Sequence, residues 1–558
     1  MEKINSKSIS EMQKTGISSE EIKKWDNPYS REIVDKFEKT LEEEKLNNKI
    51  KALKSSLIQR PLRLHAESAL GVGSASLITA TAITFNPLIG IIAGAVGSCI
   101  GFAMGSFLNI PIKDMFGIKS KENINLYKPD FKTESYAESK LLSDKVQNEL
   151  DKKTHSKLIE GNNVEILVNG INSFKKRYEL MENAKRSIDL QTFIYSDDET
   201  GWKTAKLLAE KVKQGVKCRL IYDEFVSSKN QKIFDFLTEN GVEVIRFNPK
   251  EKMENEPKHK IDKMSNLFFQ RYAHRWHQKI LCVDDASAIV GGMNISSEYA
   301  NSGTEKIDLS LGAMAGSSKW MRDTDVLIEG PVAQKAAENF AKNWKYAGGK
   351  DPRKIEYEND LTKKMGDISC RYLSHYSFEE KDKNILNYYK IMFKNCEKTA
   401  YITNPYFIPD EEMMDLMADA VKRGVDVRVL TNSDKINDME IATHAGRLNY
   451  KRLLNDGIRI YEMQPHESGH RRTLHSKIAV FYGVCSTICS SNIDNLSFGI
   501  NSENNAVFFD HGKGREMNEV FIKDCSMAKE FTLDTLKEFS FGDYAEQYIY
   551  NKFFKKIL

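Results

Sequence analysis

The pattern of hydrophobic and polar residues divides the chain into a polar start, one apolar segment and a long region of alternating strand and helix patterns. Residues 1–66 are rich in Lys and Glu, with Ile, Leu and Phe at helical spacing, which predicts a polar helical segment. No charged side chain occurs from Ser68 to Ile112, and Asn86 and Pro87 interrupt this stretch. Each arm is long enough to cross, or nearly cross, a hydrocarbon layer as a helix. We therefore expect a membrane-spanning helical hairpin at 67–112.

The glycines and the flanking charges of this hairpin support the interpretation. Glycines in its second arm recur largely at four-residue spacing, which lets two helix backbones approach closely in lipid. They are Gly90, Gly94, Gly97, Gly101 and Gly105. Lysines and arginines flank both ends, so the positive-inside rule places both ends in the cytoplasm. The alternative is a buried hairpin within a soluble helical domain. Residues 113–160, which are charged and lack strong periodicity, predict a linker.

The rest of the chain contains an internal duplication. In each copy, amphipathic helices end at a glycine and an apolar strand follows. These helix ends are Gly215 and Gly241 in the first copy, and Gly424 and Gly457 in the second. Strands that alternate with helices in this way predict an α/β fold. We expect two units, at 161–350 and 351–558, each a mixed sheet flanked by helices and related to the other by a pseudo-twofold axis.

Each copy then carries a His-x-Lys element followed by an asparagine. The residues are His277, Lys279 and Asn294 in the first copy, and His475, Lys477 and Asn492 in the second. The histidine precedes the asparagine by the same interval in both copies. One such element has no weight by itself, whereas two at matching positions of a repeat are strong evidence. On a strand, the His and Lys of one element point to the same face, so we expect both pairs to converge on one site.

This set of side chains suits the cleavage of a phosphodiester. One imidazole can attack phosphorus, the other can protonate the leaving oxygen, and the lysines and asparagines can hold the phosphate charge. No metal ion or other cofactor is then required. A nucleophilic imidazole needs an acceptor for its second nitrogen, and an acidic residue follows each motif. We expect Asp323 to be the partner of His277 and Glu503 to be the partner of His475.

Net charge and cysteine usage restrict the classes of partner, the metal sites and the compartment that we expect. Acidic and basic residues nearly cancel, at a formal net charge of +3, which argues against a general polyanion binder. No nucleic acid is therefore expected as a partner. The 8 cysteines are scattered through apolar segments, which is typical of reduced thiols in a cytosol-facing protein rather than of a zinc site.

On these motifs the chain resembles the phospholipase D superfamily, whose His-x-Lys-x4-Asp motif occurs twice in one chain, and within it the bacterial cardiolipin synthases. The resemblance covers roughly residues 165–555 and includes the segments Asn404–Asp410 and Trp320–Asp323. It implies a phospholipase D-like fold for both units, a phospholipid substrate and two membrane helices ahead of the catalytic halves. It also implies a phosphohistidine on His277, with His475 as acid and then as base. The order of the two histidines stays open, as does the oligomeric state.

The second motif departs from the family pattern. Tyr482 stands where Asp is usual, Cys489 where Gly is usual and Leu496 where Arg is usual. By strand parity, position 482 faces away from His475, so we expect the carboxylate of this motif to be a structural partner rather than a proton carrier.

The function that we expect is a phospholipase D-type hydrolase or phosphatidyltransferase, on the cytoplasmic side of a membrane. Three alternatives stay open. They are a metal-independent nuclease of the same superfamily, an inactive membrane scaffold, and a secreted bacterial effector that acts at a host membrane.

Overall fold

The computed structural model describes residues 139–227, 230–247, 274–303, 319–350, 364–377, 380, 382–465, 471–539 and 547. The expected polar segment 1–66 and the expected hairpin 67–112 lie outside these residues. Within the described ranges, no helix has the length and apolar character that a membrane crossing needs. Inside the stretch expected to be a linker, η2 (Lys140–Leu142) and α7 (Asp144–Thr154) form.

The helix α7 exists because it has a cap and an apolar face. The Ser143 side chain accepts a hydrogen bond from the Val146 amide at its first turn. Val146 and Leu150, one turn apart, are buried against the second half of the molecule. Asp151 pairs with the buried Arg371 at 2.6 Å. The segment before the first strand is thus packed against the second half of the molecule.

Two halves follow, and the strands that they contribute to the main sheet come in the same order, apart from the additional strand β17 in the second half. The first half, residues 159–350, contains the strands β1 (Ile159–Val168), β2 (Ser187–Thr192), β3 (Lys217–Asp223), β4 (Glu243–Phe247), β5 (Ile280–Val283), β6 (Ser287–Gly291), β7 (Lys319–Arg322) and β8 (Thr324–Glu329). Its helices are α8 (Asn169–Asn183), α9 (Glu199–Lys213), α10 (Glu224–Ser227), α11 (Gln231–Glu239), α14 (Ser297–Ala300) and α15 (Pro331–Tyr346).

The second half, residues 364–539, contains the strands β9 (Ile368–Tyr376), β10 (Thr399–Thr403), β11 (Asp426–Asn432), β12 (Arg459–Met463), β13 (Arg471–Leu474), β14 (Ile478–Phe481), β15 (Cys485–Cys489), β16 (Ser502–Phe509) and β17 (Ala528–Phe531). Its helices are α16 (Asn384–Asn395), α17 (Glu411–Lys422), α18 (Glu440–Asn455), α19 (Asn495–Gly499), α20 (His511–Cys525) and α21 (Leu533–Lys537).

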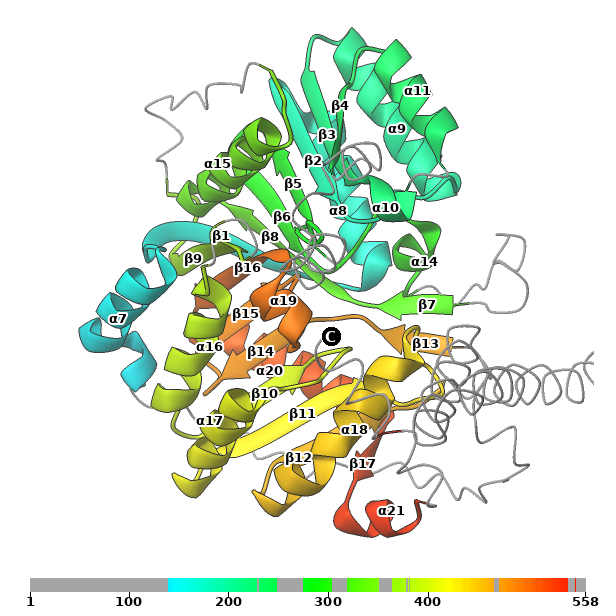
Figure 1. The fold of residues 1–558 in the computed structure, drawn as a ribbon. Coiled ribbons are helices and arrows are strands. Elements are labelled where there is room, and N and C mark those ends of the chain that lie inside the picture. The colour runs from blue at the N-terminus through cyan, green and yellow to red at the C-terminus, as the bar shows by residue number, and fades with distance from the viewer. Residues whose placement is uncertain are drawn as a thin grey trace, which may run out of the picture. The chain divides into compact units, whose positions relative to one another are not determined.

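One mixed sheet runs through both halves (Figure 1). Among the described residues it has 15 strands, in the order β17-β12-β11-β10-β14-β15-β16-β9-β1-β8-β6-β5-β2-β3-β4. Apart from β17, the order read inward from each edge places corresponding strands of the two halves at corresponding positions. β1 and β9 pair antiparallel at the middle. This symmetric order is what the predicted pseudo-twofold relation requires, and the predicted α/β class is confirmed.

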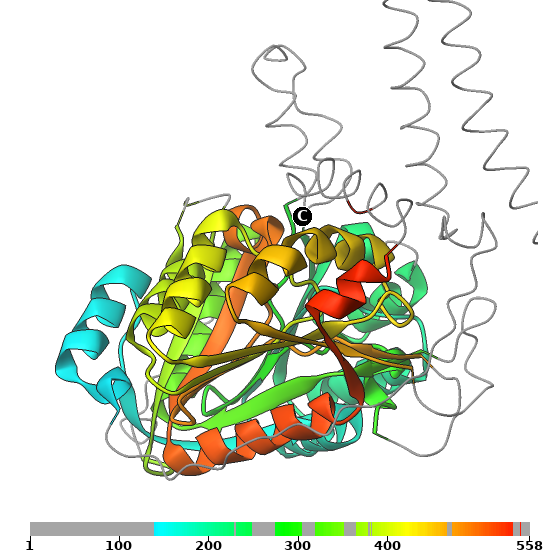
Figure 2. The same ribbon diagram turned by 90° about the horizontal axis from the view of Figure 1, so that it is seen from below.

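The helix ends that suggested the duplication have the predicted geometry. Gly215, Gly241, Gly424 and Gly457 all have positive φ values, between 81° and 89°. A residue with a side chain adopts this left-handed conformation at a cost, so glycine is the residue that ends the helix and turns the chain toward the next strand. Both sheet faces carry helices, and in Figure 2 the sheet of the second half lies between α16–α18 and α20.

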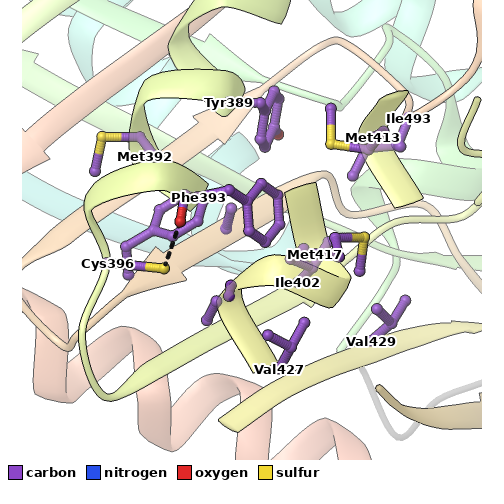
Figure 3. Close-up of a cluster of buried hydrophobic side chains, with 14 of the residues drawn as sticks. Tyr389, Met392, Phe393, Cys396, Ile402, Met413, Met417, Val427, Val429 and Ile493 are labelled. Carbon is purple, nitrogen blue, oxygen red and sulfur yellow. Dashed lines mark hydrogen bonds between the residues drawn. The ribbon is translucent and has the colours of Figure 1, made fainter. Parts of the chain in front are cut away.

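Apolar side chains fill both faces of the sheet. In the second half, α16 and α17 pack their apolar sides onto β10 and β11, and Figure 3 shows part of this cluster. Its labelled members include Met392, Phe393, Met413, Met417, Ile402, Val427 and Val429.

A separate cluster joins the two halves: Ile280 and Val326 of the first half pack in one core with Ile478 and Ala506 of the second. Removing one large buried side chain from such a core typically costs about 2–5 kcal/mol, so this shared core holds the halves together.

Short backbone pairings also cross between the halves, and they decide the position of both His-x-Lys elements. The His277 amide donates to the Ser502 carbonyl at 2.9 Å, and the His475 amide donates to the Arg322 carbonyl at 2.8 Å. β13 pairs in parallel with β7 in a separate two-stranded sheet. The prediction that each element lies within a strand was wrong, because β5 begins only at Ile280 and β14 at Ile478. The residues just before these strands are bonded to the opposite half instead.

Candidate active site

The two histidines are held by carboxylates from the opposite halves. His277 Nδ1 lies 3.1 Å from Glu503 Oε2, and His475 Nδ1 lies 2.7 Å from Asp323 Oδ2. All four predicted residues are therefore in the site, but the predicted pairing of Asp323 with His277 and of Glu503 with His475 was wrong. The crossed backbone bonds give the reason, since they place each histidine next to the acidic residue of the other half.

Both lysines fold back onto the backbone of their own histidines. Lys279 Nζ donates to the His277 carbonyl at 2.6 Å, and Lys477 Nζ donates to the His475 carbonyl, also at 2.6 Å. Lys477 Nζ also lies 3.2 Å from His475 Nε2. The Lys477 ammonium group is therefore fixed beside the imidazole of His475, since it also lies 3.3 Å from Nδ1. Two cations beside two imidazoles suit a site that binds the negative charge of a phosphodiester.

The two predicted asparagines differ in their contacts. The Asn294 side-chain oxygen accepts from the Ile194 amide at 3.0 Å, and its Nδ2 donates to the Tyr299 hydroxyl at 3.0 Å. Asn492 is buried, and its Oδ1 has no hydrogen-bond partner among the described residues. Its backbone amide donates to the Ser497 hydroxyl at 3.0 Å. Asn294 is thus part of a fixed network, whereas a buried amide oxygen of Asn492 remains for a donor on a ligand.

The third member of the first motif has a structural position. The Asp284 carboxylate accepts hydrogen bonds from three consecutive backbone amides, those of Lys185, Arg186 and Ser187, at 2.7–2.9 Å. Tyr482, its counterpart in the second motif, has the same left-handed backbone, with φ values of 53° for Asp284 and 54° for Tyr482. Its ring is buried in the apolar core of the second half. These contacts agree with the expectation that this carboxylate holds the fold and carries no proton in catalysis.

Burial favours the neutral form of both imidazoles. Burial lowers the pKa of His277, and the charges of Lys279 and Lys477 act in the same direction against Glu503. Burial and the Lys477 charge lower the pKa of His475 well below its usual value. A neutral imidazole that faces a carboxylate through Nδ1 carries its proton there. The lone pair is then on Nε2 in both histidines, which is the form that a nucleophile or a base needs.

The pKa values of the charged groups beside the imidazoles are also shifted. Burial alone would raise the pKa of Glu503, but His277, Lys279 and a hydrogen bond from Ser490 lower it to about 2. Burial raises the pKa of Asp323, and the charge of Lys477 acts against this rise. Burial, helped by the Lys477 charge, lowers the pKa of Lys279 to about 7. The positive charge of Lys279 is thus poorly stabilised until an anion binds beside it.

The structure adds residues that the sequence did not single out. The Ser490 hydroxyl donates to Glu503 Oε2 at 2.5 Å and so fixes the carboxylate that holds His277. Gln278, between the two motif residues, donates to the Glu503 carbonyl at 3.2 Å. The Tyr299 hydroxyl lies 3.4 Å from His475 Nε2. The equal spacing of Tyr299 and Ser497 from the two asparagines was a signal in the repeat that pointed to the tyrosine.

Comparison with known proteins identifies the family of this chain. The family described as "Cardiolipin synthase, PLD-like domain" matches residues 178–307 and 389–525, one segment in each half. A cardiolipin synthase of Geobacillus sp. (strain WCH70) is 30% identical over 375 residues, which cover 67% of this chain and 68% of that protein. Cardiolipin synthase B of Salmonella typhi is 27% identical over 383 residues, which cover 67% of this chain and 84% of that protein.

A solved structure shares the fold. The phosphatidylserine synthase of Haemophilus influenzae Rd KW20 superposes with a TM-score of 0.54 at 14% sequence identity, over 74% of this chain and 100% of that one. At this identity the likeness concerns the fold alone. The family match in both halves, the identity to the Geobacillus protein and the paired His-x-Lys elements lead to one conclusion. The chain belongs to the phospholipase D superfamily of enzymes, in the cardiolipin synthase family.

Proposed function

We propose that this enzyme transfers a phosphatidyl group between alcohols through a phosphohistidine, with phosphatidylglycerol as donor and cardiolipin as product. The observation that carries the proposal is the pair of crossed His–carboxylate contacts, 3.1 Å at His277 and 2.7 Å at His475. Each contact fixes Nδ1 and leaves Nε2 available for chemistry. The names of the relatives support a phospholipid substrate.

In the first step, His277 Nε2 attacks phosphorus, the bond from phosphorus to the glycerol oxygen breaks, and His475 gives a proton to that oxygen. In the second step, the hydroxyl of a second phosphatidylglycerol loses its proton to His475. Its oxygen attacks phosphorus, and the bond between phosphorus and His277 breaks. Water in place of the second lipid gives phosphatidic acid. Glu503, which is ionised, stabilises the cationic adduct on His277 through Nδ1.

The substrate takes part in setting the protonation of the site. The free enzyme holds His475 neutral, since its pKa lies well below the usual value. An acid must carry a proton when the leaving oxygen departs. The negative charge of a bound phosphodiester opposes the charges of Lys279 and Lys477, so it favours protonation of the imidazole. We therefore expect the acid to form only when a phosphodiester is bound.

The partners follow from the same proposal. A phosphatidyl donor is held in a lipid layer, so the enzyme works at a membrane surface, and we keep the cytoplasmic side and the hairpin at 67–112 as predictions. DNA serves as a negative-control substrate for the nuclease alternative.

The experiment is a product assay with the purified full-length chain on phosphatidylglycerol vesicles, with and without His277→Ala. We expect cardiolipin and free glycerol from the unaltered chain, and neither from the variant. Acid-quenched samples should contain a phosphohistidine that is lost in the variant. Absence of both lipid products from the unaltered chain would overturn the proposal, and metal-independent release of nucleotides from DNA would replace it with nuclease activity.

A further inference from the structure

A tyrosine of the first half contacts the histidine of the second half. Tyr299 is 2% exposed, and its hydroxyl lies 3.4 Å from His475 Nε2. Its ring packs edge-on against the imidazole, with the ring centroids 5.2 Å apart and the planes at 80°. Asn294 Nδ2 donates to the same hydroxyl at 3.0 Å, which fixes the oxygen of the phenol. Tyr299 thus reaches the nitrogen of His475 that the proposed chemistry uses.

The duplicated halves differ at this position. Tyr299 follows Asn294 by 5 residues, and Ser497 follows Asn492 by 5 residues. The Ser497 side chain is short, and its hydroxyl accepts from the backbone amide of its own asparagine at 3.0 Å. The second half therefore provides a local turn contact where the first half provides a phenol that crosses to the other histidine.

The aromatic neighbours of the two histidines show the same asymmetry. The Phe193 ring lies edge-on to His277, with centroids 5.1 Å apart and planes at 72°. This arrangement resembles that of Tyr299 on His475, but Phe193 has no hydroxyl. Both imidazoles contact an aromatic edge and a carboxylate, and His475 also contacts the phenol hydroxyl of Tyr299 and the ammonium group of Lys477.

The hydrogen of this bond belongs to the tyrosine. Burial and the charges of Asp438 and Asp323 raise the pKa of Tyr299 well above its usual value, so the phenol keeps its proton. His475 places its own proton on Nδ1, toward Asp323. Tyr299 therefore donates to the Nε2 lone pair of the neutral ring. A lone pair that accepts a hydrogen bond is a weaker nucleophile, whereas a proton carrier can give up this bond whenever it holds a proton on Nε2.

We propose that Tyr299 is a positioning residue for His475, which holds its Nε2 for proton transfer and thereby leaves the nucleophilic role to His277. This inference rests on the proposed phosphohistidine transfer. When Nε2 has given its proton to the leaving oxygen, the Tyr299 hydroxyl donates to the free lone pair. When Nε2 takes the proton of the acceptor alcohol, it donates to the phenol oxygen in turn. No bond to the tyrosine forms or breaks in either step.

The charges that act on His475 stay in place when the hydroxyl is removed. They belong to Asp323, Lys477, Asp438, Lys279 and His277. Tyr299→Phe keeps the ring edge and these charges, and it deletes the hydroxyl with its hydrogen bonds to His475 and Asn294. The hydroxyl donates to the neutral ring and accepts from the protonated ring, so its removal loosens Nε2 in both protonation states.

The test compares two leaving groups in single-turnover formation of the phosphohistidine by the full-length chain. One substrate is phosphatidylglycerol in vesicles, and the other is the p-nitrophenyl ester of phosphatidic acid in the same vesicles. We expect Tyr299→Phe to slow the reaction of phosphatidylglycerol about tenfold or more, because the glycerol oxygen needs a proton. The ester should react within about twofold of the unaltered rate, because p-nitrophenolate leaves without one.

A matched control is Tyr388→Phe, which removes the hydroxyl of a fully buried tyrosine that contacts Cys485 Sγ at 3.4 Å. We expect both rates to match those of the unaltered chain. Equal slowing with both leaving groups in Tyr299→Phe, or no slowing with either, overturns the positioning role while the proposed transfer stands. If the unaltered chain forms no phosphohistidine from either substrate, the proposed function fails first and the role of Tyr299 fails with it.

Discussion

Replacing Asp284 tests whether the acidic residue of the first motif holds the fold or takes part in the chemistry. Its carboxylate accepts from the amides of Lys185, Arg186 and Ser187 at 2.9, 2.7 and 2.9 Å. The first of these amides is exposed and the other two are partly buried. In Asp284→Ala, the exposed amide bonds to water again, whereas the other two lose an ionised acceptor.

The structure allows an estimate of the cost. A hydrogen bond to a charged group contributes about 1.5–3 kcal/mol when buried, so two partly buried bonds suggest about 2–4 kcal/mol. Alanine adds about 1 kcal/mol, because Asp284 has a φ of 53° and alanine is strained in that conformation. Asp284→Asn tolerates this φ and keeps one acceptor oxygen, so it should lose about half as much as the alanine variant.

The assay is urea unfolding of both variants beside phosphatidyl transfer by the folded protein. We expect the urea midpoint to be lowest for Asp284→Ala, higher for Asp284→Asn and highest for the unaltered chain. The transfer rates of the three proteins should lie within about threefold of one another. Asp534→Ala is a control, because this exposed carboxylate pairs only with the nearby exposed Lys537 among its described ion pairs. A loss of activity of about a hundredfold or more at an unchanged midpoint would refute the structural role.

Four further predictions concern other charged groups. Glu503→Gln removes the anion that faces His277, so phosphohistidine formation measured by rapid quench should fall about a hundredfold or more; a rate near that of the unaltered chain would contradict this. In pH profiles, kcat/KM should fall as pH rises through about 7, because the free enzyme then loses the Lys279 ammonium that binds phosphate. A kcat/KM that stays unchanged up to about pH 9 would contradict this role of Lys279. Between about pH 7 and 10, Lys279 is protonated in the unfolded chain and neutral in the folded one, because folding lowers its pKa. The free energy of unfolding should therefore rise with pH over this range. Asp524→Ala should cost about 3–5 kcal/mol in urea unfolding, because it leaves the buried Arg322 guanidinium without its carboxylate at 2.6 Å, and a loss below about 1 kcal/mol would show that the pair is dispensable.

The sequence predicted the fold well because its signals are local and occur twice. Gly215 and Gly424 end matching helices, and each has the left-handed backbone that a helix end requires. Helix ends and apolar strands depend on neighbouring residues, so they are readable without tertiary information. The boundaries proposed at 161–350 and 351–558 stay predictions, since one sheet runs through both halves.

The sequence indicated which residues lie together in the candidate site, but not which histidine bonds to which carboxylate. His277, His475, Asp323 and Glu503 all lie in it, but each histidine bonds to the carboxylate of the other half. Such a contact depends on how distant strands pair, and the spacing of residues along the chain contains no trace of it. Tyr299 was missed for a related reason, because a buried phenol after an asparagine is typical of an ordinary core residue.

The crossed carboxylates constrain how a duplicated gene can change. Neither half contains a complete His–carboxylate pair, so a substitution at Asp323 acts on His475 of the other repeat, and each repeat depends on the other. The motif position of Asp284 differs from these, because the hydrogen bonds that its carboxylate makes to described residues all lie within its own repeat. The sequences of the two repeats can therefore diverge at positions whose contacts stay within one repeat. Positions whose contacts cross to the other repeat can change only together with their partners.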